Sequence, residues 1–331
     1  MSLDEPSLLI TGATGFVGRT LMECVLSQNY HVFAALRSEG VSIPDDAEKV
    51  VVSNFSSTTD WSRALKTVEI VIHAAARAHI MNDTELDPLA EFRRVNTDAT
   101  LNLASQAATA GVKRFVFLSS IKVNGEFTRD KQQFTAEDNS IPDDPYALSK
   151  YEAEQGLLEI AKATNMEVVI IRPALVYGPG VKANFASMMK WVNKGVPLPF
   201  GAVHNQRSLV ALDNLVNFII HCIEHPKAAN EIFLISDNED VTTSQLLRKV
   251  AIALGKRSLL IPIPVRWMKF VAKMLGKKLV AERLFSCLQV DSSKACDLLD
   301  WQPVTTTGVH PPAKTVDENH LVIDNPEYEN P

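Results

Sequence analysis

The chain has 331 residues, a hydrophobic content of 46%, a formal net charge of -6 and a pI near 5.8. A chain of this length buries a large core, and its lack of a basic excess argues against a nucleic-acid partner. No apolar run approaches the ~18 residues of a membrane span, so we expect no stable membrane insertion. The four cysteines have neither metal-ligand nor disulfide-framework spacing, which predicts no metal site and a reducing, cytoplasmic location.

Short apolar runs alternate with helical patterns along the first half of the chain. The runs are typical of strands buried on both faces of a parallel sheet. They cover residues 7–12, 31–37, 49–54, 69–75, 114–120 and 167–173. Helical patterns cover residues 18–29, 89–111 and 146–165. This alternation predicts an α/β fold with a Rossmann-type, doubly wound parallel sheet.

The composition and pattern of the sequence change near residue 175. From there glycine and proline become frequent, and the spacing of predicted strands becomes irregular. We predict a dinucleotide-binding Rossmann domain over residues 1–175 and a smaller, mixed α/β substrate-binding lobe over 176–309. Within that lobe, residues 205–235 are expected to return to the first domain. Residues 310–331 read as a polar, proline-rich tail.

The stretch IPIPVRWMKFVAKMLGKKLV, residues 261–280, is cationic and amphipathic. We predict a helix whose apolar side faces the core and whose lysines face solvent. The alternative is a helix that lies on a membrane surface or on a partner.

A glycine loop, TGATGFVG, separates the first predicted strand from the first predicted helix. Gly12 permits a tight turn, Gly15 lets a pyrophosphate approach the backbone, and Gly18 lets the helix pack close to the sheet. The alternative is an ordinary strand-to-helix turn. The loop residues expected at the cofactor are Gly12, Thr14, Gly15, Phe16, Val17 and Gly18.

Tyr146 and Lys150 are four residues apart in PYALSKYEAE and therefore share one face of the predicted helix. Ser120 ends the run RFVFLSS, at the sheet edge where ligands of open α/β sheets bind. A phenol with a pKa of ~10 exchanges protons poorly near neutral pH, and we expect the Lys150 ammonium to lower the pKa of Tyr146. Tyr146 would then exchange a proton with a substrate oxygen that Ser120 hydrogen-bonds. The alternative is a Tyr/Lys pair on the helix surface.

Several motifs occur in a characteristic order, namely GATGFVG, HAAA, SSxxV, YxxSK and RPxxVYGPG. Together they resemble the extended short-chain dehydrogenases/reductases, or NAD-dependent epimerase/dehydratase family, over about residues 6 to 305. The chain is most similar to the nucleotide-sugar branch that contains UDP-glucose 4-epimerase and the 4-ketoreductases of UDP-N-acetyl sugars. The resemblance implies a catalytic set of Ser120, Tyr146 and Lys150, with Tyr146 and Lys150 also at the cofactor.

The resemblance further implies cofactor contacts from Asn54, Ala74, Ala75 and Asn96. Asn54 stands where the family usually has an aspartate that meets the adenine, and an amide can still accept one hydrogen bond. The alternative for Asn96 is a solvated helix residue. His73, which opens HAAA, is interpreted as a buried histidine whose hydrogen bonds are satisfied within the protein.

On the substrate side, the resemblance implies contacts from Lys122, Asn184, Phe185 and Arg207. Arg207 matches an arginine that binds the sugar diphosphate, and its alternative is a surface salt bridge. A second family arginine has only Arg283 as a weak counterpart. Lys122 and Asn124 depart from the family pattern SSxxVYG, so the sugar pocket of the epimerase cannot be copied onto this chain.

The run VFAALRSEG ends on Arg37, ~20 residues beyond the glycine loop, where dinucleotide-binding proteins distinguish phosphorylated from unphosphorylated ribose. A cation with no carboxylate beside it favours NADP(H), with NAD(H) as the alternative cofactor, and Ser38 adds a hydroxyl donor. Arg37 could instead stack on adenine or be solvated.

Because biosynthetic reductions commonly use the phosphorylated cofactor, Arg37 favours a reductase. We predict a 4-ketoreductase of a UDP-4-keto-6-deoxy-N-acetylhexosamine in bacterial surface polysaccharide (O-antigen, lipopolysaccharide) biosynthesis. The close alternative is a UDP-glucose or UDP-N-acetylglucosamine 4-epimerase, which regenerates its cofactor in each turnover. A non-catalytic dinucleotide sensor is the alternative of another class. The resemblance also implies a homodimer formed through the helices near residues 89–111 and 146–165.

Overall fold

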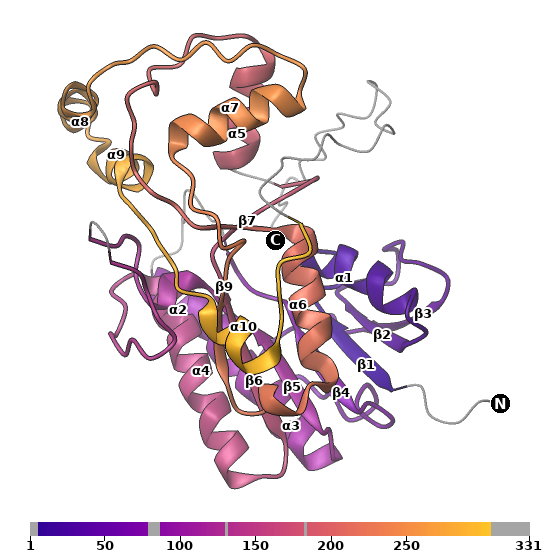
Figure 1. The fold of residues 1–331 in the computed structure, drawn as a ribbon. Helices are drawn as coiled ribbons and strands as arrows, with labels where there is room; N and C mark the ends of the chain where they lie inside the picture. Colours follow the sequence, from indigo (N-terminus) through magenta and orange to yellow (C-terminus); the bar gives the residue numbers. More distant parts are fainter. Residues whose placement is uncertain (1–5, 79–86, 130–131, 182–183, 306–331) are drawn as a thin grey trace, which may run out of the picture.

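A seven-stranded parallel sheet forms the centre of the protein in the computed structural model, which describes residues 6–78, 87–129, 132–181 and 184–305. The strand order is β3-β2-β1-β4-β5-β6-β9. The strands are β1 (Ser7–Thr11), β2 (His31–Leu36), β3 (Ala47–Val51), β4 (Ile70–His73), β5 (Arg114–Leu118), β6 (Glu167–Pro173) and β9 (Ile232–Ile235). The doubly wound α/β class and the six strands predicted in the first half are therefore confirmed (Figure 1).

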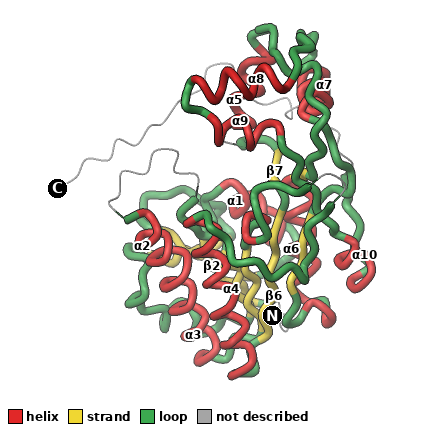
Figure 2. Tube along the Cα trace, turned by 90° about the vertical axis from the view of Figure 1, so that its left-hand side faces the viewer, coloured by secondary structure: helices red, strands yellow, loops and turns green. Residues whose placement is uncertain are grey.

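Helices cover both faces of this sheet, as Figure 2 shows. They are α1 (Phe16–Leu26), α2 (Pro88–Phe92), α3 (Ala99–Ala110), α4 (Pro145–Ala163), α6 (Leu212–Glu224) and α10 (Ser293–Leu299). Alternate strand residues point to opposite faces, so Leu8 and Ile10 of β1 pack with α1 and α6, whereas Leu9 packs with α3 and α4. The sheet is therefore buried on both sides, which explains its unbroken apolar strands.

The helix predicted over residues 89–111 is continuous but not uniform. A π-helical segment, η1 (Arg93–Asp98), joins α2 to α3. Such wide turns are rare and often occur at functional sites. Apolar periodicity did not reveal η1, because the flanking segments are helical on either side. Dimerisation through these helices and α4 stays a prediction.

A smaller lobe stands above the carboxyl ends of the strands (Figure 1). It contains β7 (Leu175–Tyr177), β8 (Leu209–Ala211), α5 (Asn184–Asn193), α7 (Thr243–Ala253), α8 (Val265–Met274) and α9 (Lys278–Phe285). Between β8 and α7 the chain returns to the main sheet, because α6 packs on it and β9 pairs with β6. The segment IFLI, which forms β9, is not among the strands predicted from the sequence. The proposed boundary near residue 176 stays a prediction.

Helix α8 contradicts the prediction for residues 261–280. None of its residues is buried, so its apolar side does not face a core. No helix in the described ranges is both long and apolar enough to cross a membrane.

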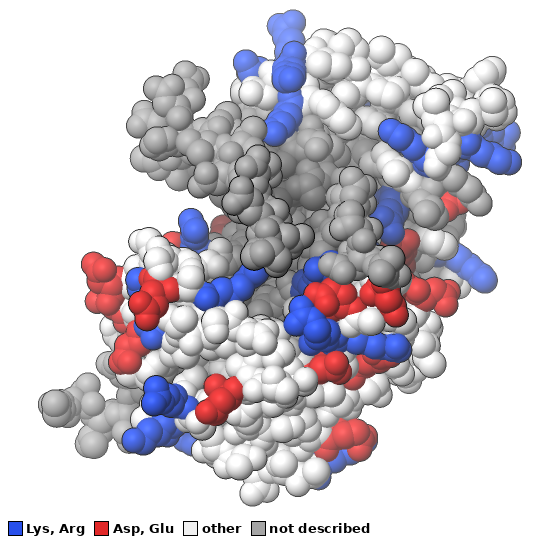
Figure 3. Space-filling model, turned by 180° about the vertical axis from the view of Figure 1, so that it is seen from behind, with Lys and Arg blue, Asp and Glu red and all other residues white. Residues whose placement is uncertain are grey.

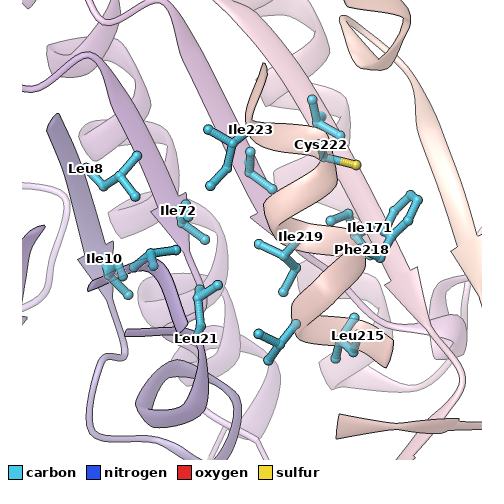
Figure 4. Packing of buried hydrophobic residues seen from close by; sticks show 14 of the residues in the cluster. Leu8, Ile10, Leu21, Ile72, Ile171, Leu215, Phe218, Ile219, Cys222 and Ile223 are labelled. Carbon is cyan, nitrogen blue, oxygen red and sulfur yellow. The ribbon is translucent and has the colours of Figure 1, made fainter. Parts of the chain in front are cut away.

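Helix α6 supplies much of the core on one face of the sheet (Figure 4). Phe218 is fully buried, and its ring packs edge-on against Phe233 at 5.4 Å and against Trp301 at 5.0 Å between centroids. Phe218 therefore joins α6 to β9 and to the segment that follows α10.

The Phe218→Ala substitution should lower the free energy of unfolding by about 3–5 kcal/mol, because it leaves a cavity among residues of three segments. Chemical denaturation followed by circular dichroism measures this loss. Ile252→Ala on α7 is the control, since this side chain is 78% exposed and its removal should cost less than about 0.5 kcal/mol. Equal effects of the two substitutions would contradict the assigned core.

Candidate functional site

The carboxyl ends of β1, β4 and β5 meet at one edge of the sheet, below the smaller lobe. The glycine loop follows β1, the HAAA stretch follows β4, and Ser120 follows β5. Parallel pairing of these neighbouring strands brings together three motifs that are far apart in the sequence. Ligands of open α/β sheets bind at this kind of edge.

The glycine loop is built from close backbone contacts. Gly12 has a positive φ of 71°, and a Cβ atom there would lie 2.7 Å from the amide nitrogen of Ala75. A Cβ atom on Gly18 would lie 2.1 Å from the carbonyl oxygen of Gly12. A side chain at Gly12 would therefore push the loop away from the segment after β4, and one at Gly18 would push α1 away from the loop, in agreement with the close packing predicted from the spacing.

Helix α1 begins at this loop without a stabilising side chain. Gly15 is its N-cap, no side chain caps it, and the first turn contains no acidic residue. The first N–H groups of α1 and the positive end of its helix dipole are therefore free to bind a ligand. They lie beside Thr14 and Gly15, which are exposed. Phe16 and Val17, the first two helical residues, are partly exposed beside them. This arrangement fits the pyrophosphate of a dinucleotide.

Ser120, Tyr146 and Lys150 lie together at the same edge. Tyr146 and Lys150 project from one face of α4, and the Tyr146 phenol lies near enough to Ser120 for this side chain to influence its pKa. The Lys150 side chain is 1% exposed, and its Nζ lies 4.1 Å from the centroid of the Phe117 ring on β5. The alternative of a Tyr/Lys pair on the helix surface is therefore wrong, because the helix directs both side chains toward the strand ends.

The protonation of this trio differs from the expected pattern. Burial raises the pKa of Tyr146 to about 12; the hydrogen bond from Ser120 opposes this rise and the nearby Asp144 carboxylate adds to it. Burial also lowers the pKa of Lys150 to about 7, against the opposing attraction of Glu154. The expectation that Lys150 lowers the pKa of Tyr146 is therefore wrong for the protein alone, because desolvation dominates both groups.

His73 is structural, as interpreted from the sequence. It is fully buried, its Nδ1 lies 2.6 Å from Thr11 Oγ1, and its Nε2 lies 2.8 Å from Thr100 Oγ1. Burial, and then the nearby Lys150, lower the pKa of His73 well below its usual value. The ring is therefore neutral and joins the end of β1 to α3.

Asn96 lies in η1 and is fully buried, so its interpretation as a solvated residue is wrong. Its Oδ1 accepts from the Arg77 amide at 2.8 Å, and its Nδ2 donates to the Arg77 carbonyl and to Ser149 Oγ, each at 3.1 Å. Both side-chain hydrogens are thus used within the protein. Asn96 therefore holds the loop after β4 against α4, beside Lys150, and its contact with a cofactor stays a prediction.

The expected adenine-side residues lie at neighbouring strand ends. Arg37 directly follows β2, is exposed, and forms no ion pair or hydrogen bond with any other described residue. Asn54 lies three positions beyond β3 and is also exposed, while its carbonyl accepts from Thr59 at 2.5 Å. Ala74 and Ala75 are small and partly buried between this side and the glycine loop.

A buried polar network beneath the trio was missed by sequence reasoning. Arg172 of β6 and Glu154 of α4 form an ion pair at 2.5 Å, with side chains 3% and 0% exposed. Ser119 also donates to Glu154. Arg172 Nη1 donates to Asn124 Oδ1 at 3.0 Å, and Asn124 donates to the Thr135 carbonyl at 2.8 Å. Two features of the sequence could have indicated this network. They are the charge of Arg172 within an apolar strand and the charge of Glu154 one turn after Lys150.

The expected substrate-side residues have distinct surroundings. Lys122 Nζ lies 3.3 Å from Glu126, 3.6 Å from Asp144 and 5.8 Å from the Tyr146 ring centroid. Its ammonium is thus held beside Tyr146. Asn184 and Phe185 begin α5, but their side chains lie outside the described part of the structure.

Arg207 is not in a surface salt bridge. Its Nη1 donates to the carbonyls of Arg283 at 2.6 Å and Ser286 at 3.4 Å, and it pairs with no carboxylate among the described residues. Burial lowers the pKa of the Arg207 guanidinium. Arg283 instead pairs with Glu126 at 2.7 Å. Arg207 thus carries a half-buried charge whose described partners are backbone carbonyls.

A hollow of about 920 Å³ lies at the opposite, amino edge of the sheet. Four of its charged lining residues form two ion pairs, Lys113 with Glu69 and Arg114 with Glu167, each at 2.5 Å. It lies away from Ser120, Tyr146, Lys150 and the glycine loop, so the candidate site is assigned to the carboxyl edge.

Glu154→Gln should lower the free energy of unfolding by about 3–5 kcal/mol, because it leaves the Arg172 charge buried without a counter-charge. Glu152→Gln is the matched control on the same helix: its partner Arg93 is 44% exposed, so the loss should stay below about 1 kcal/mol. Urea denaturation of the three proteins makes the comparison. Similar midpoints for both variants would show that the buried pair is not important for stability.

Comparisons with known proteins agree with this site. Residues 8–236 match the NAD dependent epimerase/dehydratase family. A UDP-glucose 4-epimerase from Vibrio cholerae is 50% identical over 302 residues, covering 91% of this chain and 92% of that protein.

Two solved structures share the fold. A structure of UDP-glucose 4-epimerase from Thermotoga maritima with UDP-glucose is 21% identical, has a TM-score of 0.71, and covers 91% of this chain and 94% of that one. UDP-glucuronic acid 4-epimerase from Bacillus cereus, in complex with NAD, is 20% identical, has a TM-score of 0.73, and covers 92% and 96% of the two chains.

The matched range includes the glycine loop, the HAAA stretch and the Ser120, Tyr146 and Lys150 set. It also extends through β9, which completes the main sheet. Sequence motifs, fold and similarity thus agree, and the chain belongs to the NAD dependent epimerase/dehydratase family of extended short-chain dehydrogenases/reductases.

Proposed function

We propose that this protein is an NAD-dependent UDP-sugar 4-epimerase that interconverts UDP-glucose and UDP-galactose. The observation that carries the proposal is the trio of Ser120, Tyr146 and Lys150 beside the uncapped start of α1, in a chain 50% identical to a UDP-glucose 4-epimerase. The similarity favours the epimerase over the 4-ketoreductase, which was ranked first on the evidence of Arg37. Membership of an enzyme family also disfavours a purely dinucleotide-sensing role.

The chain's own groups account for the proton transfers. Tyr146, as the phenolate, takes the proton of the sugar 4-hydroxyl while carbon 4 becomes a keto group, and Ser120 hydrogen-bonds the same oxygen. When bound, oxidised NAD supplies the hydride acceptor and a positive charge at this site. After the keto sugar has rotated to present its other face, Tyr146 returns the proton to the same oxygen, and the 4-hydroxyl would form again with the opposite configuration once the cofactor had returned the hydride. Reduced cofactor is therefore not consumed.

Because the pKa of Tyr146 is high, this proton transfer depends on a bound cofactor. A phenol whose pKa is about 12 is seldom ionised at neutral pH, so the reaction needs additional positive charge near it. Lys150, whose pKa is about 7, becomes a full cation only when a bound group offers it polar partners. We therefore propose that Lys150 hydrogen-bonds the cofactor ribose and that this contact favours the charged form of Lys150.

Arg207 is proposed to bind the sugar diphosphate. Its half-buried guanidinium has no carboxylate partner among the described residues, and the hydrogen bonds to Arg283 and Ser286 use only Nη1. The remaining donors suit phosphate oxygens. Lys122, which Glu126 and Asp144 hold beside Tyr146, is proposed to face the sugar. Contacts from Asn184 and Phe185 at the start of α5 complete the proposed substrate side.

The cofactor is proposed to be NAD, in accordance with the family. Arg37 then does not set the main cofactor but lets the site bind NADP as well. It stands at the end of β2 with no acidic partner, and its charge attracts the 2′-phosphate of NADP. An acidic residue at this position would instead repel that phosphate.

Incubation of the purified protein with UDP-glucose and NAD should yield UDP-galactose with no net change in the absorbance of reduced nicotinamide. Tyr146→Phe should lower turnover by about 10²–10⁴-fold, because the proton acceptor is lost, and should leave dinucleotide affinity nearly unchanged. Tyr151→Phe, the next tyrosine of α4, is the control and should retain parental activity. Stoichiometric consumption of reduced nicotinamide with a 4-keto sugar, without sugar interconversion, would overturn the epimerase in favour of the reductase.

Arg37→Ala should weaken NADP binding by about tenfold or more, because a charge-assisted hydrogen bond contributes ~1.5–3 kcal/mol. Its affinity for NAD should change by less than about twofold, since the unphosphorylated ribose does not need the cation. Calorimetric titration with both dinucleotides measures the two affinities, and Arg63→Ala, an exposed arginine elsewhere, is the control. An unchanged NADP-to-NAD affinity ratio would remove Arg37 from cofactor selection.

A further inference from the structure

The outer surface of α8 exposes the stripe that an amphipathic helix normally buries. Trp267, Phe270, Val271 and Met274 follow the spacing i, i+3, i+4 and i+7 of a core-facing stripe. Their side chains are nevertheless 67%, 59%, 51% and 74% exposed. Large apolar side chains that gather on a surface mark an interaction site rather than ordinary surface scatter.

The orientation of α8 is fixed by the rest of the lobe. Helix α8 packs against α9, and its inward residues Val265, Met268 and Ala272 are partly buried. Immediately before α8, the amide of Leu198 donates to the carbonyl of Leu259, and the amide of Ile261 donates to the carbonyl of Leu198, each at 2.8 Å. The helix therefore has an inner face already, and the apolar stripe points away from it.

Positive charge surrounds this stripe. Seven lysines and arginines and no aspartate or glutamate occur over residues 256–280, in a chain whose formal net charge is -6. Arg266, Lys269 and Lys273 follow one flank of the stripe, are exposed, and form no ion pair within the described part of the chain. The upper end of the molecule in Figure 3 shows blue side chains and no red ones. These three cations are therefore available to pair with anionic groups of a partner.

We propose that α8 and its cationic flank dock the protein on the surface of a membrane that contains anionic lipids. Trp and Phe side chains suit the headgroup boundary, and lysines attract lipid phosphates. The helix has ten residues, half the ~20 that a span requires, so it would lie in the interface plane. A second copy of the chain is a poorer occupant, because a two-fold contact through this surface would bring like charges together.

The test uses the full chain with two kinds of vesicle, one of phosphatidylglycerol and one of phosphatidylcholine. The protein should sediment with the phosphatidylglycerol vesicles and not with the phosphatidylcholine vesicles. Added salt should weaken this binding, because it screens the lysines.

Two double variants separate the contributions of charge and apolar surface. Lys269→Glu with Lys273→Glu, and separately Trp267→Ser with Phe270→Ser, should each lower vesicle binding by more than about tenfold. Ile252→Ser on α7, a 78% exposed side chain outside the stripe, is the control and should bind like the parent. Thermal melts should be unchanged, because all the altered side chains are exposed, and activity without vesicles should also be unchanged.

Three results would overturn the proposal. They are no binding to phosphatidylglycerol vesicles, equal binding to both kinds of vesicle, and binding that survives both double variants. Loss of a protein dimer in the Trp267→Ser, Phe270→Ser variant, without vesicle binding by the parent, would assign the surface to a second copy. Because docking does not rest on the proposed reaction, failure of the epimerase assay leaves this test intact.

Discussion

The buried ion pair between Arg172 and Glu154 is the interaction on which the site most depends. It joins β6 to α4, and Ser119 and Asn124 extend it to the segment that follows β5. Desolvated charges are tolerated only when their partners are well placed, so the pair restricts how α4 can lie on the sheet. Because α4 carries Tyr146 and Lys150, and Ser120 follows Ser119, the same restriction positions these three residues.

Electrostatics in the unliganded protein oppose catalysis rather than promote it. Burial raises the pKa of Tyr146 to about 12 and lowers that of Lys150 to about 7, so in the protein alone burial disfavours the charged form of each group. Bound groups would have to supply the missing charge and hydrogen bonds. In the proposed mechanism, proton transfer is therefore linked to occupancy of the cofactor and substrate sites, which would limit side reactions in a site that is not yet assembled.

The smaller lobe connects two features that the sequence presents separately. The carbonyl of Arg283, on α9, holds Arg207, the proposed diphosphate contact. Helix α9 also packs against α8, which carries the exposed apolar stripe and its lysines. The proposed substrate contact and the proposed membrane-docking surface thus share one supporting helix.

The sequence by itself determined the α/β class, six strands and the position of the glycine loop, and it predicted the set of Ser120, Tyr146 and Lys150, because these depend on local periodicity and on residue types at fixed spacing. It could not determine the Arg172–Glu154 pair, the clamp formed by Asn96, the raised pKa of Tyr146 or β9. Each of these depends on distant segments that meet only after folding, and desolvation follows from that packing. The sequence also showed that residues 261–280 are amphipathic, but only the tertiary structure decided which way the apolar side points, because α9 already occupies the inner face.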